Sequence, residues 1–395
     1  MTKKSDAPAI RFKGFSDAWE QRKLGELGTI TTGNTPSTSI PDYYSDDGIV
    51  WVTPTDICEN ITFESARKLS DLGQQVGRVV PKNTILVTCI ASIGKNTMLG
   101  NTGSFNQQIN GLTPNENKYD PYFLLTESAL WSAKMKGSAA AGTMQIVNRT
   151  EFSELKTWLP SLIEQQAIGA FFKQLDHLIT LHQRKFEKLT NVKKSMLEKM
   201  FPQNGSSYPE IRFKGFTDPW EQRKFEEIAV RSSVICSDDT LPRVEYEDIV
   251  SGTGRLNKDI YAKQSIKSGI AFHQGDVLYG KLRPYLQNWL LPTFDGLAVG
   301  DFWVLQPQNA DSSFLYRLIQ SRQFDEVANQ STGTKMPRAD WKLVSKTVFS
   351  IPSNISEQAA IGTYFTALDS LITLHQRELE KLQNIKKSML EKMFV

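Results

Sequence analysis

The chain has 395 residues and a formal net charge of +3 at pH 7, and 39% of its residues are hydrophobic while 23% are charged. This balance is typical of a globular protein with more than one domain, and it excludes a membrane-spanning protein, which needs about 18 consecutive apolar residues, and a protein that is basic over its whole surface. The widely spaced Cys58, Cys89 and Cys236 argue against a disulfide framework or a zinc site, and with the polar N-terminal segment they predict a cytoplasmic protein without a bound metal.

The first part of the chain, residues 1–160, predicts a mixed α/β domain. Short β-branched and aromatic runs at 50–52 and 84–88 are bounded by Gly, Pro and Asn, which is typical of strands. Residues 122–136 predict a short helix. We therefore expect a β-rich domain with a few helices.

Polar loops of this first domain are candidates for contacts with DNA. Asn and Gln side chains can bond adenine at two atoms in the major groove, and a Gly-Thr loop brings backbone amides close to an anion. The same residue types are equally typical of ordinary turns and caps. The candidates are Lys95, Asn96, Gln107, Gln108, Thr143 and Gln145.

Residues 161–202 predict one long helix. Apolar residues and one histidine recur every seven positions, at Ile168, Leu175, His182, Leu189 and Met196. Heptads of this kind favour packing of one helix on another. Pro160 and Pro202 flank the segment, as expected at the two ends of a helix. A helix of about 38 residues would be about 55–60 Å long.

Residues 203–352 predict a second mixed α/β domain. A strand is expected at 276–279 and a short helix at 314–329. The strand runs into a loop with Lys, Arg and Tyr, which offers a phosphate contact, a bidentate guanine reader and a stacking surface; the alternative is a solvated strand end. The candidates in this domain are Lys281, Arg283, Tyr285, Lys335 and Arg338.

Residues 353–395 repeat the pattern of the first long helix. The predicted seam between the two helices consists of Leu175, His182, Leu189, Leu368, His375 and Leu382. A histidine pair is a possible metal site or pH switch, but polar residues at seam positions more often set the register of packed helices, and we expect that role. Repeated lysines, among them Lys193 and Lys386, are interpreted as a solvated face near the helix ends, and the alternative is a protein-docking role, since the lysines occur in both copies.

Several blocks of the sequence occur twice, whereas the segments between them differ. Residues 10–15 return as 211–216, and 178–184 return letter for letter as 371–377, whereas the segments between these blocks share almost no letters. The order of domain, helix, domain and helix predicts an α+β fold with a pseudo-two-fold internal repeat and two antiparallel coiled-coil helices. No Walker loop, zinc spacing, glycine-rich cofactor loop or nuclease cluster is found, so no catalytic residue is expected.

These residues resemble the specificity subunit of type I restriction-modification enzymes. The resemblance covers essentially the whole chain and is carried by its repeat organisation, by Trp19–Leu27, by Glu164–Ile168 with its copy Glu357–Ile361, and by Gly275–Tyr285. The first domain lacks the Lys-Leu-Arg-Pro-Tyr loop of the second and has Ala91 where Arg283 stands, so base recognition there is harder to assign.

The resemblance implies two target recognition domains, each reading one half of an asymmetric bipartite site in double-stranded DNA. It implies that the helices set the spacing and dock two methyltransferase subunits, which carry S-adenosylmethionine and methylate adenine at N6. Motor-nuclease subunits with ATP and Mg²⁺ complete the implied complex, so this chain itself would hold no cofactor and perform no catalysis.

Two other functions are alternatives to DNA recognition. A coiled-coil scaffold that binds proteins through its two domains would explain the helices, but not the twin unlike domains with Lys, Arg and Tyr loops. A self-contained modification enzyme is disfavoured, because the sequence lacks a recognisable cofactor loop. The bases that each domain reads do not follow from the sequence.

Overall fold

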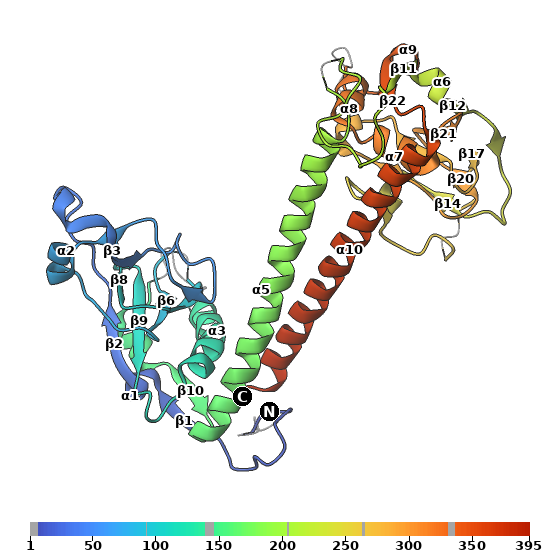
Figure 1. The fold of residues 1–395 in the computed structure, drawn as a ribbon. Helices are drawn as coiled ribbons and strands as arrows, with labels where there is room; N and C mark the ends of the chain where they lie inside the picture. The colour runs from blue at the N-terminus through green and yellow to red at the C-terminus, as the bar shows by residue number, and fades with distance from the viewer. Residues whose placement is uncertain (1–6, 92, 139–145, 204, 263–264, 331–335) are drawn as a thin grey trace. The chain divides into compact units, whose positions relative to one another are not determined.

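The computed structural model describes residues 7–395 except 92, 139–145, 204, 263–264 and 331–335 (Figure 1). The chain divides into two compact units, and the first of them is discontinuous. Unit 1 comprises Met1–Gln183 and Arg377–Val395, and unit 2 comprises Arg184–Gln376. Each unit therefore combines one α/β domain with a stretch of both long helices. The linear division into 1–160, 161–202, 203–352 and 353–395 stays a sequence-based prediction.

The domain of unit 1 is built on a five-stranded sheet in the order β2-β9-β6-β7-β4 and a three-stranded sheet in the order β5-β3-β8. Strand β1 pairs antiparallel with β10 beside the long helix. The elements are β1 Glu20–Lys23, α1 Leu24–Leu27, β2 Gly28–Thr32, η1 Pro41–Tyr43, β3 Tyr44–Val52, β4 Ile61–Thr62, β5 Lys68–Leu69, α2 Asp71–Val76, β6 Ile85–Thr88, β7 Asn96–Leu99, β8 Gly103–Phe105, β9 Ile109–Pro114, α3 Pro121–Ser138, α4 Arg149–Glu154 and β10 Lys156–Leu159.

The domain of unit 2 has two four-stranded sheets, in the orders β12-β21-β18-β19 and β13-β17-β20-β14, with a β15-β16 hairpin. Strand β11 pairs with β22 as β1 does with β10. The elements are β11 Glu221–Lys224, α6 Phe225–Ile228, β12 Ala229–Ser232, β13 Ile235–Cys236, β14 Arg243–Val244, η2 Tyr246–Asp248, β15 Ile249–Val250, β16 Arg255–Leu256, β17 Gly269–Phe272, β18 Val277–Gly280, η3 Pro284–Leu286, β19 Trp289–Leu290, β20 Gly296–Ala298, β21 Phe302–Pro307, α7 Ser312–Leu318, α8 Arg322–Ala328, α9 Trp341–Lys346 and β22 Val348–Ile351.

The predicted strand at 50–52 is confirmed as part of β3, and those at 84–88 and 276–279 are confirmed as β6 and β18, each of which begins one residue later than expected. The helix at 122–136 is confirmed as α3. The single helix expected at 314–329 is wrong, because α7 ends at Leu318 and α8 begins at Arg322. Ser321 interrupts the helical pattern by capping the new helix, where its hydroxyl accepts the backbone N–H of Phe324 at 3.4 Å.

The two long helices, α5 Leu162–Lys199 and α10 Ile355–Lys392, have 38 residues each. At 1.5 Å per residue each is about 57 Å long. None of the helices among the described residues combines the length and apolar character that crossing a membrane requires.

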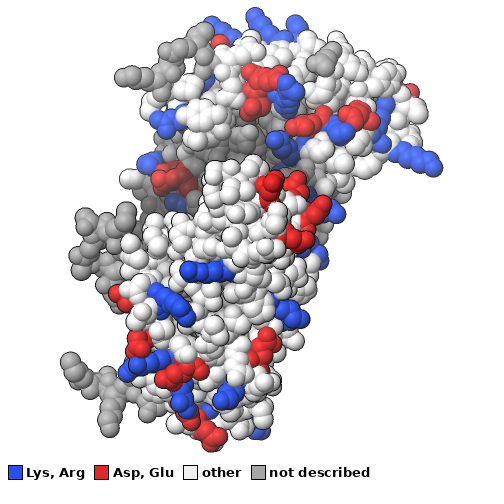
Figure 2. Space-filling model, turned by 90° about the vertical axis from the view of Figure 1, so that its left-hand side faces the viewer, with Lys and Arg blue, Asp and Glu red and all other residues white. Residues whose placement is uncertain are grey.

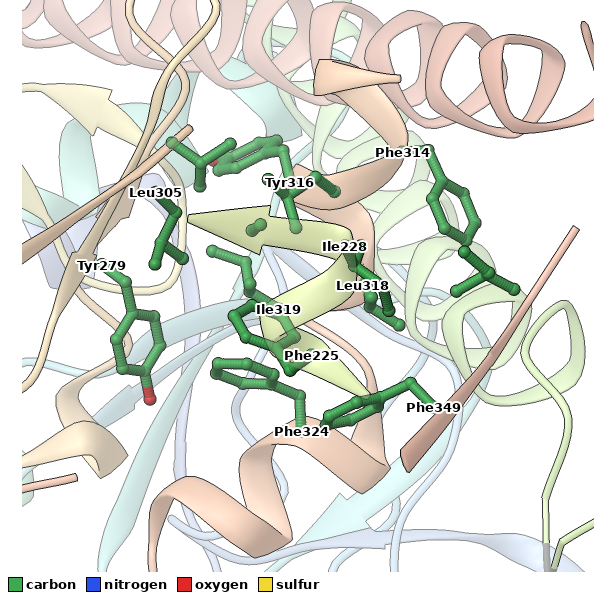
Figure 3. Packing of buried hydrophobic residues seen from close by; sticks show 14 of the residues in the cluster. Phe225, Ile228, Tyr279, Leu305, Phe314, Tyr316, Leu318, Ile319, Phe324 and Phe349 are labelled. Carbon is green, nitrogen blue, oxygen red and sulfur yellow. The ribbon is translucent and has the colours of Figure 1, made fainter. Parts of the chain in front are cut away.

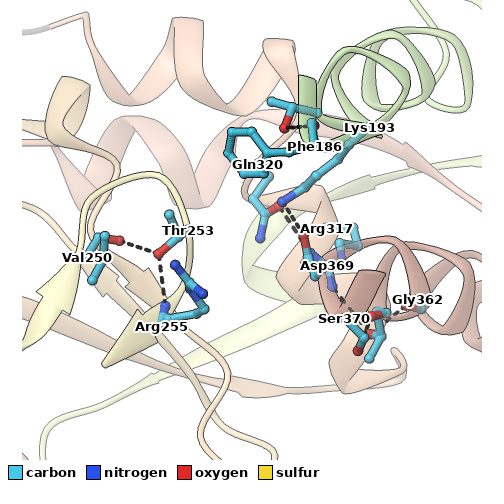
Figure 4. Close-up of polar contacts among 12 residues, drawn as sticks. Phe186, Lys193, Val250, Thr253, Arg255, Arg317, Gln320, Gly362, Asp369 and Ser370 are labelled. Atoms are coloured by element: carbon cyan, nitrogen blue, oxygen red, sulfur yellow. Dashed lines mark hydrogen bonds and ion pairs between the residues drawn. The ribbon is translucent and has the colours of Figure 1, made fainter. Parts of the chain in front are cut away.

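Ion pairs within each unit establish that α5 and α10 are antiparallel. In unit 1 the carboxylate of Asp176 accepts the Lys386 ammonium at 2.6 Å, and in unit 2 Asp369 pairs with Lys193 at the same distance (Figure 4). The start of one helix thus lies against the end of the other. Lys193 and Lys386 do not belong to a freely solvated face, as their sequence suggested, because each has a partner about 176 to 210 residues away in the chain, a separation that no local pattern records.

A buried Arg–Glu pair fixes each domain to its long helix. Arg11 donates two hydrogen bonds to Glu164 at 2.6 and 2.7 Å, and Arg212 makes the same bidentate contact with Glu357 at 2.7 and 2.8 Å. Both carboxylates are almost fully buried. Removal of either arginine would leave an unpaired buried charge, which makes the pair an obligatory part of the fold.

The next helix residue repeats a second contact. The Gln165 side chain accepts the backbone N–H of Asp120 at 3.0 Å and donates to the carbonyl of Pro160 at 2.9 Å. Gln358 does the same for Asp311 at 2.9 Å and Pro352 at 2.7 Å. The two α/β domains are therefore held on their helices by equivalent atoms, although their own sequences differ.

The hydrophobic core of each unit is completed by the C-terminal end of a long helix. Phe394 packs in unit 1 against Trp19 and Phe123, with ring centroids 6.1 and 5.5 Å apart. Phe201 packs in unit 2 against Trp220 and Phe314 at 6.1 and 5.7 Å. Figure 3 shows the hydrophobic cluster of unit 2, which extends from Phe314 on α7 to Tyr279 on β18.

We expect Phe394→Ala to destabilise unit 1 and Phe201→Ala to destabilise unit 2, each by about 3–5 kcal/mol, because a buried ring is replaced by a cavity. Hydrogen exchange of the full chain, read peptide by peptide, distinguishes the units. The exposed helix residue Ile163, of which 71% is accessible, provides the control: Ile163→Ala should change stability by less than about 0.5 kcal/mol. Equal loss of protection in both units for either Phe variant would contradict the conclusion that each phenylalanine completes the core of one unit.

Candidate nucleic-acid interface

In unit 2, the two predicted candidate loops are joined by a short β-bridge. The strand β18 ends at Gly280, and the next residue, Lys281, donates its N–H to the carbonyl of Asp301 at 2.9 Å. Leu282 and Arg338 form an antiparallel bridge, and the N–H of Ala339 reaches the carbonyl of Lys281 at 2.8 Å. Three segments that are distant in the sequence thus meet at the end of the central strand.

Unit 1 contains the same backbone arrangement with different side chains. After β6, Cys89 donates its N–H to the carbonyl of Gln108 at 2.8 Å, and its own carbonyl accepts the N–H of Val147 at 2.9 Å. Ile90 and Ile146 form the antiparallel bridge. The sequence alone gave no sign that Gln108 and Asp301 occupy equivalent places in the two domains.

The residue after the bridge is left-handed in both domains. Arg283 has φ 49° and Ala91 has φ 59°, a region that side chains with a Cβ rarely adopt. In unit 2 the turn η3 follows, and Gln287 is left-handed as well, with φ 55°. Tyr246 supports this turn from below by donating its hydroxyl to the carbonyl of Leu282 at 2.6 Å, and burial raises the pKa of that hydroxyl. The surrounding contacts therefore hold a strained loop in one conformation.

The loop cluster of unit 2 is basic. Asp301 pairs with Arg338 at 3.1 Å and with Lys281 at 3.5 Å, and Arg338 remains 60% exposed. Tyr285 is 57% exposed. With Arg283, the cluster carries three cationic side chains and one carboxylate. Lys335, also a candidate, lies outside the described residues.

The loop cluster of unit 1 consists mainly of amides. Asn106 and Gln108 bond each other, through Nδ2 to Oε1 and from the Gln108 N–H to Oδ1, both at 3.1 Å. Gln107 is exposed and accepts the hydroxyl of Thr35. Asn110 is buried and ties β9 to the bridge by donating to the carbonyl of Val147 at 3.2 Å, so it has a structural role.

The other candidates of unit 1 are not all in this cluster. Lys95 donates its ammonium to the carbonyl of Pro54 at 2.9 Å, and it is exposed. The side-chain oxygen of Asn96 accepts the hydroxyl of Ser132 on α3 at 2.7 Å, which engages it inside the domain. Thr143 and Gln145 lie outside the described residues. Gln107 and Gln108 are thus the best placed of the predicted residues in this unit.

The predicted seam residues lie along the paired helices. Leu175 and Leu368 are buried, and Leu368 belongs to the hydrophobic cluster of unit 2. The other four are partly buried: Leu189, Leu382, His182 and His375. Within the part of the chain that the structure describes, no group of three or more His, Cys, Asp or Glu side chains is arranged to hold a metal ion.

A carboxyl group with a strongly raised pKa lies in the core of unit 1, away from the loops. Burial raises the pKa of Glu127 to about 8, although hydrogen bonds from Thr157 and from the Trp158 N–H at 3.3 Å oppose the shift. Trp131 donates its indole N–H to the same Thr157 hydroxyl at 2.9 Å. These contacts join α3 to β10, so we interpret Glu127 as a structural residue.

Charged side chains are mixed on the surface. On the face drawn in Figure 2, Lys and Arg alternate with Asp and Glu among the described residues, and neither unit carries a broad basic area there. This distribution agrees with the net charge of +3. Attraction to a polyanion would therefore depend on local groups such as the unit 2 loop cluster.

Comparisons with known proteins agree with this two-domain organisation. The chain is 22% identical to the MjaIX specificity subunit of a type I restriction enzyme from Methanocaldococcus jannaschii, over 95% of this chain and 92% of that protein. It is 22% identical to the EcoDI specificity subunit from Escherichia coli, over 75% and 76% of the two chains. Its fold is similar to the crystal structure of a type I restriction-modification S subunit from M. genitalium, with a TM-score of 0.68 and 14% identity over 98% and 99% of the chains.

A family description matches most of the sequence in two copies. The type I restriction modification DNA specificity domain matches residues 16–191 and again residues 219–384, one copy for each domain and the long helix that follows it. Each match includes a loop cluster, the glutamate of the Arg–Glu pair and most of the long helix. The chain therefore belongs to the family of type I restriction-modification DNA specificity domains.

Proposed function

We propose that this chain is the DNA sequence-recognition subunit of a type I restriction-modification complex, and that each domain reads one half of an asymmetric bipartite site. The observation that carries the proposal is the duplicated loop cluster: one backbone arrangement presents Gln107 and Gln108 in unit 1 and Lys281, Arg283 and Arg338 in unit 2. Amides suit adenine and arginine suits guanine in the major groove. Two unlike clusters on one frame support recognition of two unlike half-sequences.

A protein-binding scaffold explains these features less well. It would account for the long helices, but it gives no reason for a strained, basic loop at the end of β18 with an exposed Tyr285. Strained backbone is typically retained at functional sites, where it fixes a side chain for a ligand. The DNA-reading function is thus the better supported of the two.

The helices are proposed to dock two identical methyltransferase subunits. One solved relative, with a TM-score of 0.51 and 14% identity, is described as bearing on complex assembly of the type I R-M system. In this chain, an exposed leucine pair occurs twice: Leu178 and Leu181 are 42% and 38% exposed, and their copies Leu371 and Leu374 are 44% and 52% exposed. A surface that occurs twice supports two copies of one partner.

A shallow polar groove on the helices is also duplicated. In unit 2 it has a volume of about 500 Å³ and lies along α5, and in unit 1 a groove of about 560 Å³ lies along α10. Six lining residues of the second groove are the repeat copies of the six in the first, and Met389 lines the second groove in addition. They are Arg184, Glu187, Lys188, Asn191, Val192 and Ser195 in the first, and Arg377, Glu380, Lys381, Asn384, Ile385 and Ser388 in the second. The grooves extend the proposed docking surfaces along both helices.

The chemistry of the proposed complex belongs to the partners. The methyltransferase subunits would bind S-adenosylmethionine and methylate adenine at N6, and motor-nuclease subunits would use ATP and Mg²⁺. This chain would select the DNA sequence and would bind no cofactor of its own. Since the proposed substrate is DNA, the cytoplasm is the proposed place of action.

Mapping of methylated adenine in cells with and without this chain tests the proposed function. We expect methylation at a bipartite sequence with two unlike halves, and loss of that methylation without the chain. A chain with one extra heptad in both α5 and α10 should widen the unread gap by about three base pairs, because seven residues add about 10.5 Å. Unchanged methylation without the chain would refute the recognition function, and altered half-sequences in the heptad variant would refute the spacer role.

The docking surfaces predict a stepwise loss of partners. Changing Leu178 and Leu181 to Ser should remove one methyltransferase subunit from the complex, and the same change at Leu371 and Leu374 should remove the other, while all four changes should remove both. Native mass spectrometry of the complex counts the subunits. The exposed Ile163 and Ile355, changed to Ser, provide the matched control. Full assembly of the fourfold variant would show that the leucines are not the docking surface.

The contribution of the Arg283 side chain to DNA binding can be separated from the backbone strain at this position. Arg283→Gly should leave the free energy of unfolding within about 1 kcal/mol, because relief of left-handed strain offsets the greater freedom of glycine in the unfolded chain. DNA binding should nevertheless weaken by about tenfold. The slope of log affinity against log salt concentration should become shallower by about one, as expected for the loss of one phosphate contact. Ala91→Gly is the control, since it relieves the same strain without removing a charge. Equal DNA affinity of both variants would exclude Arg283 from the interface.

A further inference from the structure

Asp301 places a carboxylate in the middle of the basic loop cluster of unit 2. It lies between Gly300, which has φ 100°, and the first residue of β21, and its carbonyl accepts the N–H of Lys281 at 2.9 Å. Asp301 is therefore fixed to the edge of β18 through its backbone. Its side chain is 28% exposed.

The two carboxylate oxygens of Asp301 serve two different cations. Oδ2 accepts from Nη2 of Arg338 at 3.1 Å, and Oδ1 faces the Lys281 ammonium at 3.5 Å. An isolated carboxylate near DNA phosphates would be repelled. With Lys281 and Arg338 on either side, the three groups together keep a net positive charge, so the carboxylate is tolerated at a surface that approaches a polyanion.

The geometry leaves Arg338 suited to reading a base. A guanidinium has five N–H donors in a rigid fork, and guanine O6 and N7 require only two of them. Asp301 holds the Nη2 end, while 60% of the side chain stays exposed. An arginine that is oriented in advance loses less conformational freedom when it binds.

We propose that Asp301 is a positioning residue that presents Arg338 to a guanine in the second half-sequence, with Lys281 compensating its charge. This inference rests on the proposed function and adds a base identity to it. Unit 1 provides an internal contrast, because Cys89, Gln108 and Ile146 stand where unit 2 has Lys281, Asp301 and Arg338. The arginine-based reading of guanine is therefore assigned to the second half-sequence alone.

The test uses the assembled complex and maps methylated adenine for the wild type, Asp301→Asn and Arg338→Lys. We expect the wild-type second half-sequence to contain a guanine, and both variants to lose about tenfold or more of the discrimination at that one position. Arg338→Lys keeps the charge and removes the fork, so it separates base reading from attraction to phosphate. The first half-sequence should be unchanged in both variants.

Asp295→Asn is the matched control, since Asp295 is an exposed carboxylate of the same domain that pairs with His273 at 3.1 Å. It removes the same charge and should leave both half-sequences intact. Thermal unfolding of each variant checks the fold, and Arg338→Lys carries the test alone if Asp301→Asn fails to fold.

Three results would overturn the inference: a second half-sequence without guanine, unchanged discrimination in the variants, or a uniform loss of methylation with an unaltered sequence preference, which would indicate a structural role. In each of these cases wild-type methylation still depends on the chain, so the proposed function stands. Loss of the proposed function itself would appear differently, as methylation that is the same with and without the wild-type chain.

Discussion

The fold depends on burying the end of each long helix in an α/β core. Phe394 and Phe201 are 6% and 3% exposed, and each packs among aromatic rings of the unit where its helix ends. The N–H of Ile10 reaches the carbonyl of Lys392 at 2.9 Å, and that of Ile211 reaches Lys199 at the same distance. Because each core is completed by a helix end, a domain cannot be separated from the helix pair without exposing a large apolar surface.

This constraint explains which residues the two halves share. The shared contacts all lie where a domain meets a long helix. They are the Arg–Glu pairs, the hydrogen bonds of Gln165 and Gln358, and the packing of Phe201 and Phe394. Close approach adds another requirement, because a Cβ on Gly169 would meet Asp120 at 2.3 Å and a Cβ on Gly362 would meet Ser313. Residues at the loop clusters escape these packing demands, so they can differ between the halves while the backbone beneath them stays the same.

Much of the fold could be predicted from the sequence, because heptads and short β-branched runs are local signals. The long helices and the strands β3, β6 and β18 follow from such patterns. The solvated role expected for Lys193 failed because Asp369 lies far along the chain. The candidate loops could be named from their residue types, but their meeting through the Leu282–Arg338 bridge could not. Asp301 was missed because an aspartate after glycine, just before a strand, is typical of an ordinary turn.

The two loop clusters differ in charge, so the two units would contribute differently to the binding of one DNA site. The unit 2 cluster has three cationic side chains and a single carboxylate, which pairs with two of them, so its binding energy would contain a large electrostatic part that weakens with salt. The unit 1 cluster is built on Asn106, Gln107 and Gln108, whose hydrogen bonds are neutral and nearly independent of salt. With a net charge of only +3, the chain has little long-range attraction to add to either. Unit 2 would therefore contribute most to the initial capture of DNA, and unit 1 would contribute mainly to discrimination once the duplex is held.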